Sequence, residues 1–161
     1  MKAAVGTRPT VDASSYPQLT TVQSRWSDND LFGHLNNAVY YELFDSEINR
    51  HLSRATGLAP NEFPLLGVVA ESSCRFRSEV SFPADLRVGL AVERLGRTSV
   101  TYALALFAEE DPWPAAEARW VHVYVDRATR RPAPIPDVVR TCLEPLVWPT
   151  STAPADSSRD E

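Results

Sequence analysis

The sequence has 161 residues and a mass of 17.9 kDa, which predicts a single domain with a sizeable hydrophobic core. Its net charge of -5 and pI near 5.2 lack the positive charge typical of nucleic-acid binding. No run approaches the roughly 18 apolar residues of a membrane span, and residues 1–15 lack the apolar segment of a signal peptide. With two widely separated cysteines, Cys74 and Cys142, these features predict a cytoplasmic protein without nucleic-acid or membrane partners.

Both ends of the chain differ in composition from its centre. Residues 1–15 are small and polar without periodicity, and the C-terminal residues have the composition of disorder. We therefore expect an N-terminal tail over residues 1–15, one domain over residues 16–148 and a disordered C-terminal tail over residues 149–161.

A strand and a long helix are predicted in the first third of the chain. Residues 19–26 are rich in β-formers and predict a strand that runs into a polar turn over residues 27–37. Residues 37–56 contain neither proline nor glycine, their apolar residues recur at helical spacing, and Gly57 supplies a stop. This predicts a helix of about five turns, ~30 Å long. Its first two turns are apolar nearly all round, so we expect a sheet to cover it.

Four further strands are predicted after the helix. Residues 65–77 are strand-like, and apolar residues alternate with others in segments 86–93, 100–106 and 121–125. A short terminal helix is expected over residues 137–146. One helix followed by a run of strands with short connections favours an α+β layer fold with antiparallel neighbours.

Several kinds of catalytic motif are absent from the sequence. There is no Gly-x-Ser-x-Gly elbow, no dinucleotide fingerprint or P-loop, and the three histidines lack zinc-ligand spacing. Asp28, Asp30 and Gly33 mimic the start of a calcium loop, but Phe32 and Val39 occupy two positions that need oxygen ligands. No metal site and no cofactor are therefore predicted.

The polar turn before the helix is the candidate site that remains. A helix start presents unpaired backbone N–H groups and a partial positive charge, which suits an anion or an oxyanion. Asp30 lies beside this start. Taken alone, an aspartate there favours a plain helix cap.

The residues of this turn carry a resemblance to a known family. Residues 30–40 read Asp-Leu-Phe-Gly-His-Leu-Asn-Asn-Ala-Val-Tyr, which resembles the signature of hot-dog fold acyl-CoA thioesterases in the 4-hydroxybenzoyl-CoA thioesterase branch. The order of strand, long helix and four strands is also similar, as are segments 121–126, 129–132 and 134–136. The likeness covers roughly residues 19–140. It implies a hot-dog fold, in which an antiparallel five-stranded sheet wraps around one long central helix.

The resemblance implies a thioester hydrolase and assigns roles in the turn. Asp30 would supply the essential carboxylate, as nucleophile or general base, and the amide at Asn37 would bind the oxyanion. His34 could orient Asp30 or a water, or be a local ligand of the turn. Thioester hydrolysis needs such an attacking group and such donors, and an aspartate is ionised at neutral pH.

Substrate-binding positions follow from the same resemblance. Gly33, Asn36 and Tyr40 are expected to line the site, with Asn36 also a helix cap and Tyr40 a core residue. Asp28 is expected to be structural. A catalytic pair of Cys74 with a histidine of the last strand, His122, is conceivable, but nothing in the sequence brings the two together.

The partner expected is an acyl-CoA or an acyl-carrier-protein thioester. Arg127 and Arg130 follow the last strand and could hold coenzyme A phosphates, as could Arg94 and Arg97. Family members form dimers or tetramers with active sites between subunits, which implies that Ser99 of a neighbouring chain contributes. A non-catalytic acyl-CoA-binding module and an acyl-thioester hydratase or dehydratase on the same fold are the alternatives.

Overall fold

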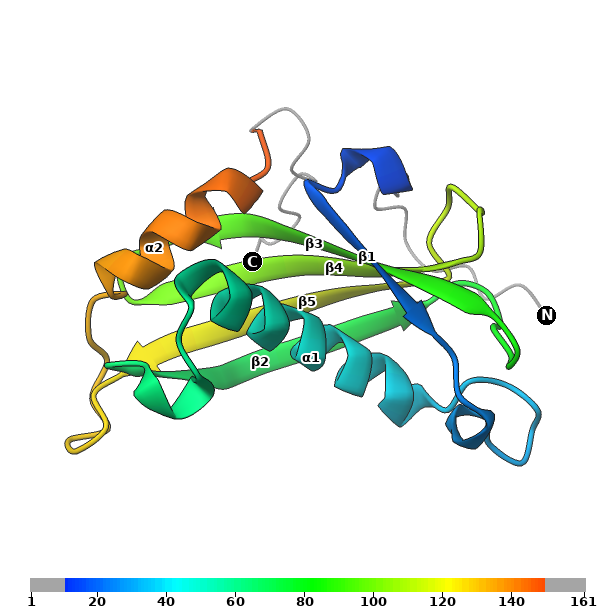
Figure 1. The fold of residues 1–161 in the computed structure, drawn as a ribbon, viewed down its shortest axis with the longest axis horizontal. Helices are drawn as coiled ribbons and strands as arrows, with labels where there is room; N and C mark the ends of the chain where they lie inside the picture. The colour runs from blue at the N-terminus through cyan, green and yellow to red at the C-terminus, as the bar shows by residue number, and fades with distance from the viewer. Residues whose placement is uncertain (1–10, 150–161) are drawn as a thin grey trace, which may run out of the picture.

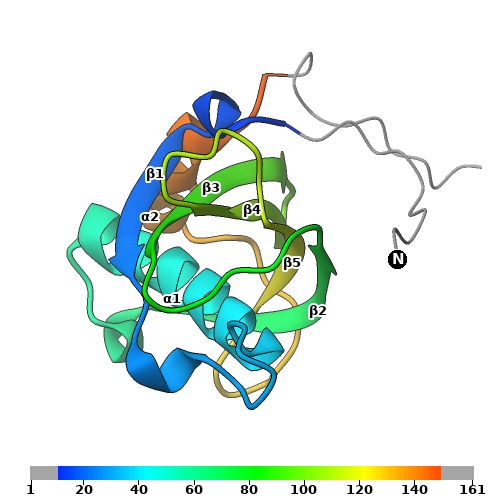
Figure 2. The same cartoon turned by 90° about the vertical axis from the view of Figure 1, so that its right-hand side faces the viewer.

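A five-stranded antiparallel sheet curves around one long helix in the computed structural model, which describes residues 11–149 (Figures 1 and 2). The sheet order is β1-β3-β4-β5-β2. The strands are β1 (Gln18–Gln23), β2 (Leu66–Phe76), β3 (Asp85–Leu95), β4 (Ser99–Ala108) and β5 (Ala116–Val125), and the helices are α1 (Asn37–Thr56) and α2 (Asp137–Leu143). This arrangement confirms the predicted α+β hot-dog fold.

The central helix α1 begins and ends where the sequence predicts. Asn36 precedes it with an extended backbone, and Gly57 ends it in the left-handed conformation with φ 72°. Phe44 and Ile48 are fully buried against the concave face of the sheet. The apolar side of the helix therefore forms most of the contact with the main core.

A buried carboxylate fixes α1 against the edge strand β1. The side chain of Glu47 is 1% exposed, and it accepts hydrogen bonds from Gln18 Nε2 at 2.7 Å and Thr20 Oγ1 at 2.6 Å. Arg50 Nη1 donates to its other oxygen at 2.8 Å. Because a buried charge is tolerated only when it is paired and hydrogen-bonded, these donors set the position of the helix relative to β1.

Two strand boundaries differ most from the sequence-based expectation. β1 ends at Gln23, because Trp26–Asp28 forms a 3-10 turn directly after it. β5 begins at Ala116, five residues before the predicted start at 121, because its first inward-facing residues are the small Ala116 and Ala118. Small side chains gave no strong alternation of large apolar residues.

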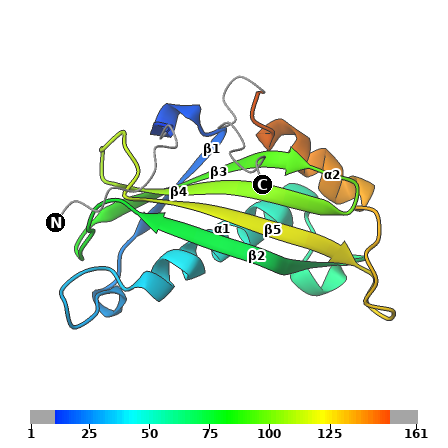
Figure 3. The same cartoon turned by 180° about the vertical axis from the view of Figure 1, so that it is seen from behind.

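The outer face of the sheet carries a second, smaller core (Figure 3). Ala13–Ser15 forms a 3-10 helix, and Tyr16 and Trp148 pack beside it against β3 and β4. Trp148 Nε1 donates to the carbonyl of Ser15 at 2.8 Å. Residues 11–15 of the expected N-terminal tail are thus packed, while residues 1–10 and 150–161 lie outside the described residues.

β2 forms one edge of the sheet (Figure 2). It pairs with β5 on one side, and its other edge has no strand partner within residues 11–149. Val68, Val69 and Phe76 on this strand are exposed. None of the helices in the described part of the chain is long and apolar enough to cross a membrane.

Candidate active site

Asp30 lies in a tight turn that leads directly into α1. Its backbone N–H donates to the carbonyl of His34 at 2.9 Å, and its carboxylate oxygen Oδ1 accepts from the N–H of Phe32 at 2.8 Å. Gly33 has φ +84°, a conformation that glycine adopts without strain. These contacts hold the Asp30 carboxylate in place at the helix start.

The same turn is tied to the connection between β2 and β3. The N–H of Leu35 donates to the carbonyl of Val80 at 2.7 Å, and Ser81 Oγ donates to the carbonyl of Gly33 at 2.8 Å. Segments almost fifty residues apart therefore fix each other. This pairing brings the end of β2 beside the start of α1.

The first turn of α1 leaves one backbone donor available. Asn36 Oδ1 accepts from the N–H of Ala38 at 2.9 Å, which confirms Asn36 as the helix cap, and the Asn36 carbonyl accepts from Val39. Asn37 is the first helical residue, so its N–H has no intrahelical acceptor. Among the described residues it donates to no other group. It is the donor that an oxyanion at this position could use.

A surface cleft of about 310 Å³ opens over this helix start. It brings together four of the predicted site residues: Asp30, His34, Asn37 and Tyr40. Its remaining lining comes from Phe32, Leu35, Phe76, Ser78, Glu79 and Val80. Gly33 shapes the turn and Asn36 caps the helix, so both support the cleft without lining it.

The His34 ring pairs with a carboxylate that the sequence analysis did not single out. His34 Nε2 lies 3.1 Å from Glu79 Oε2, and the two side chains are 40% and 78% exposed. An ion pair this exposed contributes little to stability. Among the described residues the ring pairs with Glu79 rather than Asp30, so the idea that His34 orients Asp30 stays a prediction.

Residues at the end of β2 line one side of the cleft, and the sequence did not predict them as site residues. Phe76 packs edge to face on Tyr40 with ring centroids 5.0 Å apart, and Ser78 and Glu79 follow it. Burial raises the pKa of Tyr40, so its hydroxyl stays protonated at neutral pH. No local signal could have found these residues, because they reach the cleft through the register of β2 with β5.

Asp28 is structural, as predicted. It is 3% exposed, and its two carboxylate oxygens accept from the backbone N–H of Arg25 at 2.7 Å and from Arg25 Nε at 2.9 Å. This pair closes the turn between β1 and Asp30.

Ser99 and the arginines predicted to bind coenzyme A phosphates lie at the opposite end of the sheet in the same chain. Ser99 pairs with Val123, whereas Phe76 of the cleft pairs with Ala116, seven residues or ~23 Å away along β5. Arg127 and Arg130 come after the end of β5. The Arg127 guanidinium donates to the carbonyl of a loop residue, Phe63, at 2.8 and 3.0 Å. Within one chain these residues do not join the cleft.

The Cys74 and His122 pair is not formed. Cys74 lies opposite Ala118 while His122 lies opposite Val69, so the two are four residues apart along β5, or ~13 Å. Burial raises the pKa of Cys74 to about 11, which keeps the thiol protonated at neutral pH. A cysteine nucleophile activated by this histidine is excluded.

Cys74 is expected to react slowly with iodoacetamide. At pH 8, a thiol with a pKa of about 11 holds roughly a hundredfold less thiolate than one at the ordinary value of 9.0, and the thiolate is the reactive form. Intact-mass spectrometry of a Cys142→Ala variant over time measures this rate against free cysteine. A rate equal to that of free cysteine would contradict the raised pKa.

In residues 11–149 no group of three or more His, Cys, Asp or Glu side chains is placed to hold a metal ion. The residues that line the cleft supply a carboxylate from Asp30, the backbone N–H of Asn37 at the start of α1 and the protonated hydroxyl of Tyr40. Such an arrangement suits attack on a carbonyl carbon and stabilisation of the oxyanion that forms.

Solved structures share the fold over nearly their whole length. The PA5185 protein from Pseudomonas aeruginosa strain PAO1 is 39% identical, with 87% of this chain and 98% of that chain covered and a TM-score of 0.82. A thioesterase from Thermus thermophilus, complexed with coenzyme A and Zn, is 27% identical, with 82% and 95% covered and a TM-score of 0.68. A 1,4-dihydroxy-2-naphthoyl-CoA thioesterase from Synechocystis, Slr0204, shares the fold at 17% identity, with 78% and 93% covered and a TM-score of 0.72.

No curated protein matches the chain. The sequence profile of the thioesterase-like superfamily matches residues 24–143, a range that contains the Asp30 turn, the whole of α1 and strands β2 to β5. The chain therefore belongs to the thioesterase-like superfamily of hot-dog proteins.

Proposed function

We propose that this protein is an acyl-CoA thioesterase that hydrolyses an acyl thioester to a carboxylic acid and coenzyme A. The observation that carries the proposal is the cleft that both Asp30 and Asn37 line, where the N–H of Asn37 has no intrahelical acceptor. Membership of the thioesterase-like superfamily supports the same reaction. Coenzyme A bound to the Thermus thermophilus relative supports the choice of thiol.

Asp30 and the N–H of Asn37 have different roles in the proposed reaction. Asp30 attacks the thioester carbonyl carbon itself, or removes a proton from a water that attacks it. The negative charge that develops on the carbonyl oxygen accepts a hydrogen bond from the N–H of Asn37 and is favoured by the positive end of the α1 dipole. The carbon–sulfur bond then breaks and the thiolate of coenzyme A leaves. If Asp30 is the nucleophile, a water hydrolyses the resulting anhydride and regenerates the carboxylate.

The cleft offers an apolar side for the acyl group. Leu35, Tyr40 and Phe76 line it beside Asp30. Tyr40 and Phe76 meet edge to face, which presents ring surface next to the reacting position. An acyl chain can therefore be buried away from water against the side of the cleft that α1 and β2 form.

Self-association is part of the proposal. β2 offers an edge without a strand partner in the described chain, and Val68, Val69 and Phe76 on it are exposed. Pairing of this edge with a second copy would cover apolar surface and satisfy backbone groups. Ser99, Arg127 and Arg130 lie too far from Asp30 to serve their own chain, so any contribution from them comes from a neighbouring subunit.

A thiol-release screen tests the function. The protein is mixed with aromatic, short, medium and long acyl-CoAs, and free thiol is followed with a chromogenic disulfide. We expect turnover of at least one class. Tight binding of acyl-CoA without turnover across the panel would replace the proposal with the binding-module alternative, and product with an intact thioester would indicate hydration.

A further inference from the structure

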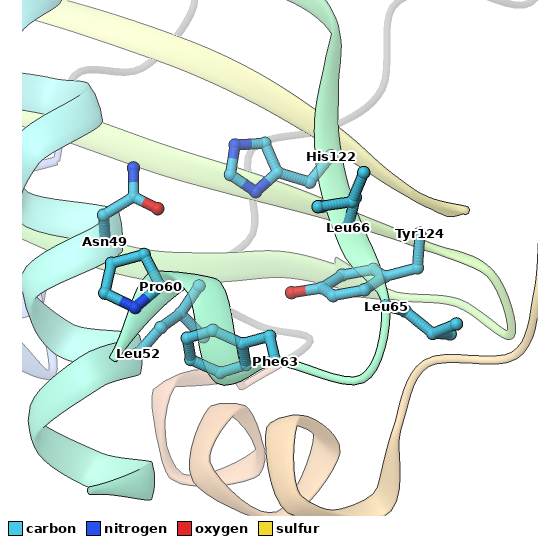
Figure 4. Close-up of a pocket in the computed structure, with 9 residues that line it drawn as sticks. Asn49, Leu52, Pro60, Phe63, Leu65, Leu66, His122 and Tyr124 are labelled. Carbon is cyan, nitrogen blue, oxygen red and sulfur yellow. The ribbon is translucent and has the colours of Figure 1, made fainter. Parts of the chain in front are cut away.

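A second cavity lies beside the C-terminal half of α1, where Asn49 and Leu52 line it (Figure 4). Its volume is about 210 Å³. It is lined by Asn49, Leu52, Pro60, Phe63, Leu65, Leu66, Gly67, His122 and Tyr124. One part of the lining is apolar, and the side toward β5 is polar (Figure 4).

His122 is the buried polar group of this cavity. Its side chain is 2% exposed and lines the cavity from β5, with its ring edge-on to Tyr102 at 5.3 Å. Neither ring nitrogen has a hydrogen-bond partner among residues 11–149. Buried polar groups are nearly always hydrogen-bonded, so an imidazole with two unmatched nitrogens beside a cavity points to a ligand.

Two further polar groups face the same space. Asn49 Nδ2 donates to the carbonyl of Asp45 at 2.9 Å, which leaves Asn49 Oδ1 as an acceptor toward the cavity (Figure 4). The Tyr124 hydroxyl points toward α1 across the cavity (Figure 4). Burial raises the pKa of Tyr124 to about 12, so this hydroxyl is protonated and can donate.

Gly67 keeps the space beside these groups open. A β-carbon there would lie 3.3 Å from Tyr124 Cζ and 3.4 Å from His122 Nδ1. The backbone of Gly67 is not in a left-handed conformation, so turn geometry does not require a glycine at this position. Its missing side chain therefore lets the rings of Tyr124 and His122 lie close to β2.

The charges around the cavity favour an uncharged ligand group. Burial lowers the pKa of His122, and the nearby Asp45 carboxylate opposes this effect only in part, so the imidazole is neutral at pH 7. No Lys or Arg lines the cavity among the described residues. Because the lining offers both a donor, from Tyr124, and an acceptor, from Asn49, the group that matches it is a hydroxyl, which donates and accepts at once.

The cavity and the cleft lie along one exposed strip of β2. Val69, Ser72 and Phe76 pair with residues of β5 whose side chains face α1, so they face it as well. All three are nevertheless exposed. Asn37, whose N–H would bind the oxyanion, and Asn49 in the cavity are twelve residues apart on α1, about 18 Å along its axis and roughly the span of fifteen extended carbon atoms.

We propose that this cavity is a subsite for a hydroxyl group carried near the far end of an acyl chain of about fifteen carbons. The chain follows the β2 strip from the cleft, and His122, Asn49 and Tyr124 recognise the hydroxyl. This inference rests on the proposed thioesterase function and names its substrate class as hydroxylated long-chain acyl thioesters.

The test compares pentadecanoyl-CoA with 15-hydroxypentadecanoyl-CoA. We expect kcat/KM for the hydroxylated substrate to be about tenfold higher, the effect of one satisfied buried hydrogen bond. Tyr124→Phe, Asn49→Ala and His122→Leu should each bring the ratio to about one. Arg54→Ala, an exposed change on the same helix, should leave it unchanged. No preference in the wild type, or one that survives all three variants, overturns the proposal.

A binding measurement separates this proposal from the thioesterase function. Addition of 15-hydroxypentadecanoate should shift the His122 ring resonances in nitrogen-15 NMR spectra, while pentadecanoate should shift them far less. If neither acyl-CoA is hydrolysed, the thioesterase proposal fails, and this spectrum alone tests whether the cavity binds a hydroxyl group. Equal responses to the two acids would overturn the subsite proposal. Should His122→Leu not fold, Tyr124→Phe and Asn49→Ala carry the comparison.

Discussion

Replacing Asp30 with asparagine is expected to lower kcat for acyl-CoA hydrolysis by about a thousandfold or more. The amide is nearly the same size as the carboxylate, and its oxygen can still accept from the N–H of Phe32, so the turn should keep its shape. It can neither attack the carbonyl nor remove a proton from water. Thiol release under saturating substrate measures the loss.

Asp85→Asn is the matched control, because it makes the same change at an exposed carboxylate at the start of β3. It should retain full activity, and both variants should unfold at the temperature of the wild type. Turnover that survives in a folded Asp30→Asn protein would remove Asp30 from the mechanism and leave Glu79 as the other carboxylate of the cleft.

The role of the carboxylate can be decided in labelled water. In a single turnover with oxygen-18 water, a covalent anhydride at Asp30 leaves label in the aspartate side chain when water attacks there, whereas general-base catalysis puts label in the acid product alone. Mass spectrometry of the peptide that contains residues 26–50 distinguishes the two paths.

Phe44→Ala is expected to lower the free energy of unfolding by about 3–5 kcal/mol, because it removes a ring from a fully packed site and leaves a cavity. Phe44 is 0% exposed in the middle of α1, and its ring contacts Trp120 with centroids 6.5 Å apart. Denaturant unfolding followed by circular dichroism measures the change.

Ser46→Ala, an exposed change two residues along the same helix, serves as the comparison and should stay within about 0.5 kcal/mol of the wild type. A loss below about 1 kcal/mol for Phe44→Ala would mean that α1 contributes little to the core.

The local part of the site could be predicted from the sequence because its signals are adjacent in the chain. Asn36 as cap, Gly57 as stop and the uninterrupted stretch between them predicted α1 to the residue. The same short segment carries Asp30, His34, Asn37 and Tyr40, so that one turn followed by one helix is enough to bring them into one cleft.

Sites that depend on strand register could not be predicted in this way. Glu79 and Phe76 are more than thirty residues from Asp30, and they meet the cleft because the end of β2 is bound to the turn through Leu35 and Val80. The start of β5 was missed because Ala116 and Ala118 face inward where larger residues would have marked a strand.

His122 illustrates the difference most clearly. In the sequence it alternates with the valines of the last strand and shares a face with Trp120 and Tyr124, which indicates a packed or interfacial residue but no cavity. Register with Val69 turns it inward, and Gly67 and Asn49 then complete a cavity around it. Burial and the absence of a hydrogen-bond partner within the described residues are tertiary facts that no spacing along the chain encodes.

By itself, the sequence determined the class of fold, the bounds of α1 and the turn that presents Asp30, because helix caps, glycine conformations and hydrophobic period act between near neighbours. Only the tertiary structure decided that the end of β2 lines the cleft and that a second cavity exists. It also decided that Cys74 and His122 stay apart and that Arg127 is far from Asp30. These outcomes depend on pairing between distant strands, where a shift of one residue would reverse every inward and outward side chain.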